Sequence, residues 1–313
     1  MMRISVVIPL HNEEKNLPHL IEAIMQQSSL PAEIILVDAW STDKTGQIIH
    51  AASESFPIIK PIAVKLKLNP GETRNLGFLY STCEWVVFLD AGHYPSADWI
   101  LNLTKCTSGF ADIVFSNRRL TAQKTRFQVF DLLYEPIGFN ESQAHFRNPK
   151  VSSTMMRREV FEKLGKFNNW RSGEDKEFLS RIIGTSLQTS NCTDATVYVQ
   201  PASSLLELLI KQKTYAWHNS SRLLEGSHKR VLFYIGIDIV ALILGLYIFP
   251  LYFSMFLFYS QRFMRLVPRM KKIRNLLNSD FHATLKNWFL APFVSAISDY
   301  FVLTGVIFRR LGL

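Results

Sequence analysis

Short apolar runs alternate with amphipathic stretches along the first two thirds of the chain. Leu17, Leu20, Ile21 and Ile24, for example, share one face of a helix expected near 14–27. Strand–helix units in series favour a parallel sheet, so we expect an α/β domain. The predicted strands cover 4–9, 33–38, 61–66, 85–90 and 112–117, and the remaining helices lie near 43–54, 71–82 and 96–105.

The order of elements changes after residue 150. A strand is expected at 151–156, and another at 194–199 after two helices. The predicted helices of this part are 159–164, 174–184 and one near 203–224.

Polar groups follow three of the apolar runs. Glu13 follows the first run, whereas Asp38 and Asp90 end two others. The carboxyl ends of parallel strands are where open α/β sheets bind ligands. Three carboxylates there suit the base, the ribose and the bound metal of a sugar nucleotide. The alternative is structural: Pro9 and Asn12 form an ordinary strand-to-helix turn with Asn12 as the cap, and Asp38, Thr42 or Asp43 caps the next helix.

Two further motifs suit a nucleotide. Gly71 permits a tight helix entry, whose free N–H groups favour phosphate, and Arg74 adds positive charge. Asp90, followed by Ala91, Gly92 and His93, can hold ribose hydroxyls or a divalent metal. The alternatives are a surface helix and a turn-forming aspartate.

The second half of the domain offers an acidic pair and an aromatic group. Glu174 and Asp175 open a predicted helix, where they either cap it or provide a base that deprotonates a sugar hydroxyl; Asp175 is the better candidate. A later set is expected to close over a diphosphate or an acceptor, or to anchor at a membrane interface: Gln212, Tyr215, Trp217 and His218.

The last third of the chain favours membrane attachment. Segments 231–259 and 288–308 are apolar, with one acidic residue each. A basic cluster between them, which contributes to the net charge of +9, suits anionic lipid better than nucleic acid. A kinked hairpin, spanning helices and a buried soluble hairpin stay open as arrangements. The cluster comprises Arg262, Arg265, Arg269, Lys271, Lys272 and Arg274.

Three cysteines without a C-x-x-C pair make a disulfide framework or a zinc site unexpected. A reducing cytosol is therefore the predicted compartment. An apolar strand that begins at residue 4 leaves no room for a signal peptide.

In this order, the motifs resemble those of family 2 glycosyltransferases with the GT-A fold. The resemblance covers residues 1–225 and rests on Val6–Glu14, Val37–Asp43, Arg74–Gly77, Asp90–Gly92 and the pair Glu174 and Asp175. It implies a Rossmann-like, mostly parallel sheet in residues 1–225, and the apolar segments described above predict C-terminal membrane helices in residues 226–313. It also implies that Pro9, Glu13 and Asp38 line the nucleoside pocket, with Arg74 and Asp90 near the nucleotide and Asp175 as general base.

The chain departs from this family pattern at three places. Ala39 and Gly92 stand where carboxylates are usual, and Tyr215 stands where processive members carry arginine. A divalent cation, Mg²⁺ or Mn²⁺, is therefore an uncertain cofactor: His93 either completes its site with Asp90, or basic groups neutralise the diphosphate instead.

The resemblance predicts an inverting transferase at the cytoplasmic membrane, with its catalytic domain in the cytoplasm. The expected partners are a nucleotide-sugar donor, a lipid-linked or cell-surface glycan acceptor and membrane lipids, but no nucleic acid. A transferase for a soluble acceptor that is only tethered to the membrane, and an inactive nucleotide-sugar-binding regulator, are the alternatives.

Overall fold

The computed structural model describes residues 2–107, 109–120, 150–170 and 173–199, and a few isolated positions beyond residue 200. The chain divides into two compact units. One comprises residues 1–121 and 137–200, and the other comprises residues 122–136 and 201–313. The first unit contains every described strand. The predicted boundary at residue 225 lies outside the described residues.

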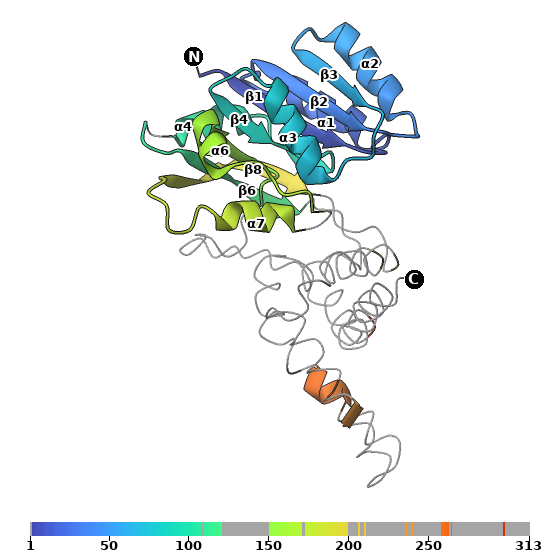
Figure 1. Cartoon of the computed structure of the whole chain (residues 1–313), viewed down its shortest axis with the longest axis vertical. Coiled ribbons are helices and arrows are strands. Elements are labelled where there is room, and N and C mark those ends of the chain that lie inside the picture. Colours follow the sequence, from blue (N-terminus) through green and yellow to red (C-terminus); the bar gives the residue numbers. More distant parts are fainter. Residues whose placement is uncertain are drawn as a thin grey trace. The chain divides into compact units, whose positions relative to one another are not determined.

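The first unit is built on one sheet of eight described strands in the order β3-β2-β1-β4-β7-β6-β8-β5 (Figure 1). β1 to β4 are mutually parallel, whereas β7 runs antiparallel to both β4 and β6. The sheet is therefore mixed, and the predicted parallel order holds in its N-terminal half. The strands are β1 (Ile4–Leu10), β2 (Glu33–Ala39), β3 (Ile59–Val64), β4 (Trp85–Phe88), β5 (His93–Pro95), β6 (Ile113–Leu120), β7 (Thr154–Arg157) and β8 (Thr189–Val199).

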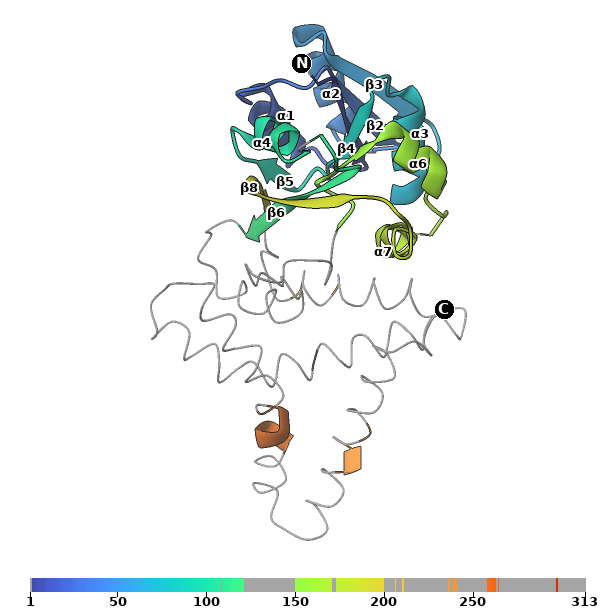
Figure 2. The same ribbon diagram turned by 90° about the vertical axis from the view of Figure 1, so that its left-hand side faces the viewer.

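Helices cover both faces of this sheet. α1 (Leu17–Met25), α2 (Thr45–Ser55) and α4 (Trp99–Lys105) pack with one set of strand side chains. α3 (Pro70–Tyr80), α6 (Arg158–Leu164) and α7 (Glu174–Ser180) pack with the other set. Figure 2 shows α1 and α4 on one side of the sheet and α3, α6 and α7 on the other. Two hydrophobic cores result.

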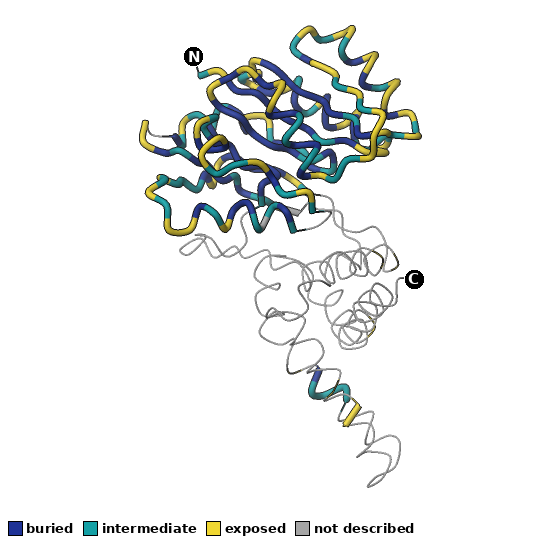
Figure 3. Tube along the Cα trace, in the orientation of Figure 1, coloured by how far each residue is buried: buried dark blue, intermediate teal, exposed yellow. Residues whose placement is uncertain are grey.

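The double cover explains the continuous apolar runs in the sequence. Val6 and Val7 point to opposite faces of β1, and both are fully buried. The same holds for Leu36 and Val37 of β2, so β1 and β2 are buried along their length except at Pro9 and Asp38, which are partly exposed (Figure 3). Strand alternation between apolar and polar residues is therefore absent here.

The predicted strands and helices within the described residues are confirmed, with end points shifted by a few residues. β5 was not predicted, because it has only three residues and immediately follows the turn at Asp90. None of the helices in the described part of the chain is long and apolar enough to cross a membrane. Apart from isolated positions, the apolar segments 231–259 and 288–308 lie outside the described residues.

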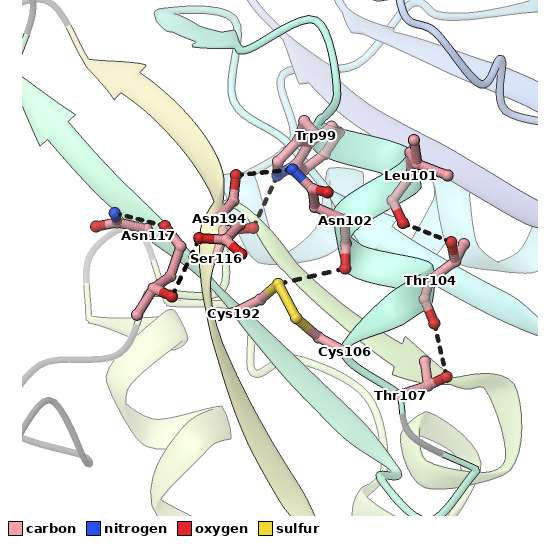
Figure 4. Close-up of a disulfide and its surroundings, with 11 residues drawn as sticks. Trp99, Leu101, Asn102, Thr104, Cys106, Thr107, Ser116, Asn117, Cys192 and Asp194 are labelled. Carbon is pink, nitrogen blue, oxygen red and sulfur yellow. Dashed lines mark hydrogen bonds between the residues drawn. A yellow bond between two sulfur atoms is a disulfide. The ribbon is translucent and has the colours of Figure 1, made fainter.

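A disulfide joins Cys106, which follows α4, to Cys192 on β8 (Figure 4). The expectation of no disulfide was wrong. The two residues are separated by 86 positions in sequence, and only the fold brings their Cα atoms to within 5.7 Å. Around the bond, α4 is also tied to β8 and β6 by Asn102, which donates to the carbonyl of Asp194, and by Trp99, which donates to Ser116. Cys83 is a buried free thiol.

Candidate active site

The loops that follow β1, β2 and β4 meet at one edge of the sheet. Leu10 is paired with Asp38 across β1 and β2, and β4 lies on the other side of β1. Pro9 is the partly exposed residue of β1 just before this edge. The structure thus brings together the predicted groups of all three strands, as parallel pairing requires.

The loops after β1 and β2 are cross-linked by hydrogen bonds. The backbone N–H of Asn12 donates to the hydroxyl of Ser41 over 2.8 Å, and the backbone N–H of Thr42 donates to the side-chain oxygen of Asn12 over 2.8 Å. Oδ1 of Asp38 accepts the N–H of Ser41 at 3.0 Å and its hydroxyl at 2.6 Å. Asn12 does not cap α1, whose N-cap is Asn16. One oxygen of Asp38 therefore organises its own loop.

Trp40 sits in this loop in an unusual conformation. Its φ is +59°, in the left-handed region that bulky residues rarely adopt, and the residue is 53% exposed. The carbonyl of Ala39, just before it, is 2.9 Å from Nδ1 of His11. Residues held in this region cluster at functional sites, so Trp40 marks the β2 loop as a constrained part of the site.

Glu13 lies in the loop after β1, close to other acidic groups. Burial raises the pKa of its carboxyl, and the negative charges of Asp90 and Asp43 raise it further. The side-chain amide of Asn16 donates to Oε2 of Glu13 over 2.8 Å, which opposes this rise. Glu13 and Asp90 are therefore electrostatic neighbours across two loops, as the sequence predicted for the site.

Arg74 joins two candidate carboxylates. Its Nη2 donates to Oδ1 of Asp90 and its Nη1 to Oε1 of Glu174, both over 2.8 Å. The arginine side chain is 6% exposed and that of Glu174 is 8%, whereas that of Asp90 is 35% exposed. Burial raises the pKa of Asp90, but Arg74 and the neighbouring basic groups outweigh it and hold the pKa at about 2. Burial raises the pKa of Glu174, and the charge of Arg74 opposes that rise.

A cluster of phenylalanines positions α7, which carries Glu174 and Asp175. Phe178 of α7 packs at a ring distance of 4.2 Å from Phe167, and Phe161 packs at 3.9 Å from Phe78 of α3. Gly71 allows the start of α3 to approach this segment, because a Cβ there would lie 2.8 Å from the carbonyl oxygen of Asn168. Gly71 is thus buried in a packing contact, a role that sequence reasoning missed.

Asp175 follows Glu174 in the first turn of α7 and is partly exposed. Its negative charge contributes to the raised pKa of Glu174, so the two carboxylates are close. Because Glu174 is buried against Arg74, Asp175 is the more accessible of the pair. The two neighbouring carboxylates therefore differ in environment: Glu174 is paired with Arg74, and Asp175 is partly exposed.

The turn after β4 carries the last predicted groups. The N–H of His93 donates to the carbonyl of Asp90 over 3.0 Å, which closes a turn around Gly92. Nη2 of Arg118, on β6, lies 3.1 Å from Nε2 of His93. Sequence reasoning missed Arg118, because nothing in an isolated strand shows that it faces Asp90. Gln212, Tyr215, Trp217 and His218 lie outside the described residues.

Comparison with known proteins agrees with this geometry. The family model described as "Glycosyl transferase family 2" matches residues 5–165, more than half of the chain. The chain belongs to this family. The match covers β1 to β4 with their loops and ends at Gly165, before α7, so it includes every described site residue except Glu174 and Asp175.

Two curated relatives illustrate the similarity. An undecaprenyl-phosphate 4-deoxy-4-formamido-L-arabinose transferase of Photorhabdus laumondii is 34% identical over 131 residues, which is 40% of this chain and 40% of that protein. The glycosyltransferase AglE of Haloferax volcanii is 26% identical over 215 residues, which is 67% of this chain and 70% of the relative. The aligned segment of the first relative is therefore less than half of its length.

Among solved structures, S. aureus TarS residues 1–349 in complex with UDP-GlcNAc has a TM-score of 0.53 with 16% identity. The similarity covers 99% of this chain and 92% of that one. At this identity the likeness shows the fold alone, which is of the GT-A type that the sequence predicted.

Proposed function

We propose that this chain is an inverting glycosyltransferase that moves a sugar from a nucleotide-sugar donor to a lipid-linked or cell-surface glycan acceptor. The observation that carries the proposal is the Arg74 bridge. It joins Asp90, just after β4, and Glu174, at the start of α7, through a single guanidinium, and Asp175 follows Glu174 in the first turn of that helix. Family membership supplies the class of chemistry.

The donor's nucleoside is assigned to the loops after β1, β2 and β4. Pro9, Asn12 and Glu13 come from the first of these, and Asp38 from the second. One oxygen of Asp38 is engaged by Ser41, and the other is the candidate acceptor for a base N–H. Asp90, 35% exposed and ionised at neutral pH, is the candidate acceptor for ribose hydroxyls.

The transfer is a single displacement. The acceptor hydroxyl oxygen attacks the anomeric carbon while the bond from that carbon to the phosphate oxygen breaks, and the nucleoside diphosphate leaves with the electron pair. The hydroxyl proton passes to the carboxylate of Asp175, the general base in this proposal. Glu174 is assigned a positioning role, because its ion pair with Arg74 fixes the first turn of α7.

The residues around Asp90 do not fit a divalent cation. Oδ1 of Asp90 is bound by Arg74, Gly92 has no carboxylate, and Nε2 of His93 faces Arg118. Within the described ranges, no group of three or more His, Cys, Asp or Glu residues could hold a metal ion. Magnesium and calcium prefer several oxygen ligands. The proposed displacement therefore uses no bound metal.

The acceptor is proposed from the relatives. Several of them, including one from Serratia proteamaculans that is 37% identical over 117 residues, are named undecaprenyl-phosphate transferases. A polyprenyl phosphate lies in a membrane, which suits the predicted apolar segments 231–259 and 288–308 and the basic cluster from Arg262 to Arg274. Arg262, the described member of that cluster, is buried, and its guanidinium lies over the ring of Phe258.

We further propose that the catalytic unit works on the cytoplasmic side of the membrane. A cysteine introduced at Met270, within the basic cluster, should react with an impermeant reagent only after the cells are opened. Labelling in intact cells would place the cluster outside. On the cytoplasmic side Cys106 and Cys192 are expected as thiols. Their disulfide should therefore form after the protein has been extracted from the cells into an oxidising buffer.

Donor and acceptor panels test the function. Purified full-length protein is screened by thermal shift against UDP-, GDP-, CDP- and dTDP-sugars, because a bound donor stabilises the folded state by mass action. The stabilising donor is then incubated with undecaprenyl phosphate in detergent, and the product's anomeric configuration is read by NMR. Transfer with inversion is expected. A donor that binds but is neither transferred nor hydrolysed would favour a sugar-nucleotide sensor instead.

A further inference from the structure

The charges around Asp90 are unevenly paired. Arg74 is shared by two carboxylates, Asp90 and Glu174, so its single positive charge is already offset. A nucleotide-sugar donor brings a diphosphate to the same edge of the sheet, and its negative charge grows as the sugar leaves. Arg74 alone therefore cannot neutralise the diphosphate.

Arg118 provides a second cation at this edge. β6 and β4 are both antiparallel to β7, so they run in the same direction, and Arg118 near the end of β6 lies at the same edge as Asp90. It contacts His93, whose backbone N–H donates to the carbonyl of Asp90, so it lies beside the turn that carries Asp90. Its charge helps to lower the pKa of Asp90. Within the described part of the chain, no carboxylate lies within ion-pair distance of Arg118.

His93 fixes this arginine in place. A guanidinium can only donate, so Nε2 of His93 is the acceptor of the 3.1 Å hydrogen bond and the ring proton is on Nδ1. The histidine is 7% exposed, and a neutral acceptor brings no negative charge to Arg118. Nε of Arg118 is buried without a hydrogen-bond partner among the described residues, so the guanidinium keeps donor capacity.

We infer that Arg118, oriented by His93, binds the diphosphate of the donor in the place where a divalent cation would otherwise act. A guanidinium presents several N–H donors in a plane and can bind two phosphate oxygens at once, so it can neutralise and orient a diphosphate. The inference rests on the proposed function. It also explains how the site can work without a carboxylate at Gly92: the positive charge comes from β6, a strand two places away from β4 in the sheet.

Isothermal titration of the full-length protein tests this directly. UDP, GDP, CDP and dTDP are titrated in buffer with EDTA and in buffer with MnCl₂. The nucleoside diphosphate with the lowest dissociation constant is then used as the probe. The wild-type dissociation constant should change less than about threefold between the two buffers, less than 1 kcal/mol. Arg118→Met should weaken binding of the probe about 10- to 100-fold, because a charge-assisted hydrogen bond to phosphate is lost.

Three controls make the result specific. Arg119→Met changes the exposed neighbour on β6 and should leave the affinity unchanged. The matching nucleoside, which has no phosphate, should bind wild type and Arg118→Met equally. Gly92→Asp adds the missing carboxylate, where a new Cβ meets nothing within 4 Å, so it should fold normally. The double variant Gly92→Asp/Arg118→Met should bind the nucleoside diphosphate about tenfold or more tightly when Mn²⁺ is added.

The outcomes separate the inference from the proposed function. Diphosphate affinity that survives Arg118→Met, or wild-type affinity that collapses in EDTA, would overturn the inference and leave the glycosyltransferase standing. No binding of any of the four nucleotides in either buffer would overturn both. Loss of nucleoside affinity in Arg118→Met would show a general structural effect and would also count against the inference.

Discussion

Nη2 of Arg74 lies 2.8 Å from Oδ1 of Asp90, and this pair connects helix α3 to the end of strand β4 at the heart of the site. The same guanidinium reaches Glu174, so one arginine orders two carboxylates that are 84 positions apart in sequence. The sequence predicted Arg74 near the nucleotide as a source of positive charge. In the structure, it acts first as the link that fixes the acidic groups.

Arg74→Met should therefore destabilise the fold strongly. It leaves Asp90 and Glu174 without their shared cation, and breaking a buried pair in this way costs about 3–5 kcal/mol. Urea unfolding followed by circular dichroism measures the change. Arg3→Met, at an exposed arginine, is the control and should shift the free energy of unfolding by less than about 0.5 kcal/mol. Equal stability of the two variants would show that the bridge contributes little.

Glu33 gives a prediction at the opposite end of the sheet. Burial raises the pKa of its carboxyl, but Lys60, Ser5 and Thr82 donate hydrogen bonds to it and lower the pKa to about 2. The ionised carboxylate therefore stabilises the fold above its ordinary pKa of 4.5, and this contribution is lost as the pH falls through about 2. Glu33→Gln should cost about 1–3 kcal/mol at pH 7.

The acid part of that prediction is read from unfolding curves between pH 7 and pH 2. The difference in stability between wild type and Glu33→Gln should shrink as the pH falls below 4.5. Glu54→Gln, at a carboxylate that is 70% exposed, should show no such pH dependence beyond a few tenths of a kcal/mol. A constant difference across the range would mean that the network does not depend on the charge of Glu33.

Replacement of Trp40 by asparagine should stabilise the fold. A left-handed conformation costs a bulky residue roughly 1–2 kcal/mol, and asparagine tolerates it better. Because the side chain is 53% exposed, little burial is lost. Trp40→Asn should raise the free energy of unfolding by roughly 1 kcal/mol, whereas Trp40→Phe, which keeps the strain, should not. A loss of stability in Trp40→Asn would show that the indole packs productively.

The disulfide should stabilise the purified protein. It closes a long loop, with 86 positions between Cys106 and Cys192, and bonds of this kind contribute about 2–5 kcal/mol. Dithiothreitol should lower the melting temperature of wild type and leave the melting temperature of Cys106→Ser unchanged. Identical melting temperatures of wild type with and without the reductant would mean that the bond does not form in solution.

The sequence predicted the parts of the fold that depend on local pattern. Continuous apolar runs such as that of β2, and the acidic residues at their ends, identified the α/β domain and placed Asp38 and Asp90 at one edge. The direction of β7 and the pairing of β6 with β8 could not be predicted, because long-range packing decides them.

The contacts made across the fold were also beyond the sequence. Cys106 and Cys192 showed no spacing motif, and the Arg118–His93 contact joins a strand to a turn 25 positions away. Gly71 was assigned to a phosphate turn from its local pattern, whereas the close approach of Phe167, Asn168 and Glu174 to the start of α3 explains its small size. Local pattern thus finds the candidate groups, and tertiary packing decides which of them meet.

The most direct test of the account is the turnover of Asp175→Asn, with the donor and acceptor identified by the panels. A general base contributes about 10²- to 10⁴-fold, so this variant should lose at least about a hundredfold in turnover while it binds the donor normally. Glu177→Gln, two residues after Asp175 on α7 and paired with Arg181, is the matched control and should keep its turnover within about threefold. Near-normal turnover in Asp175→Asn, with the same donor affinity, would contradict the account.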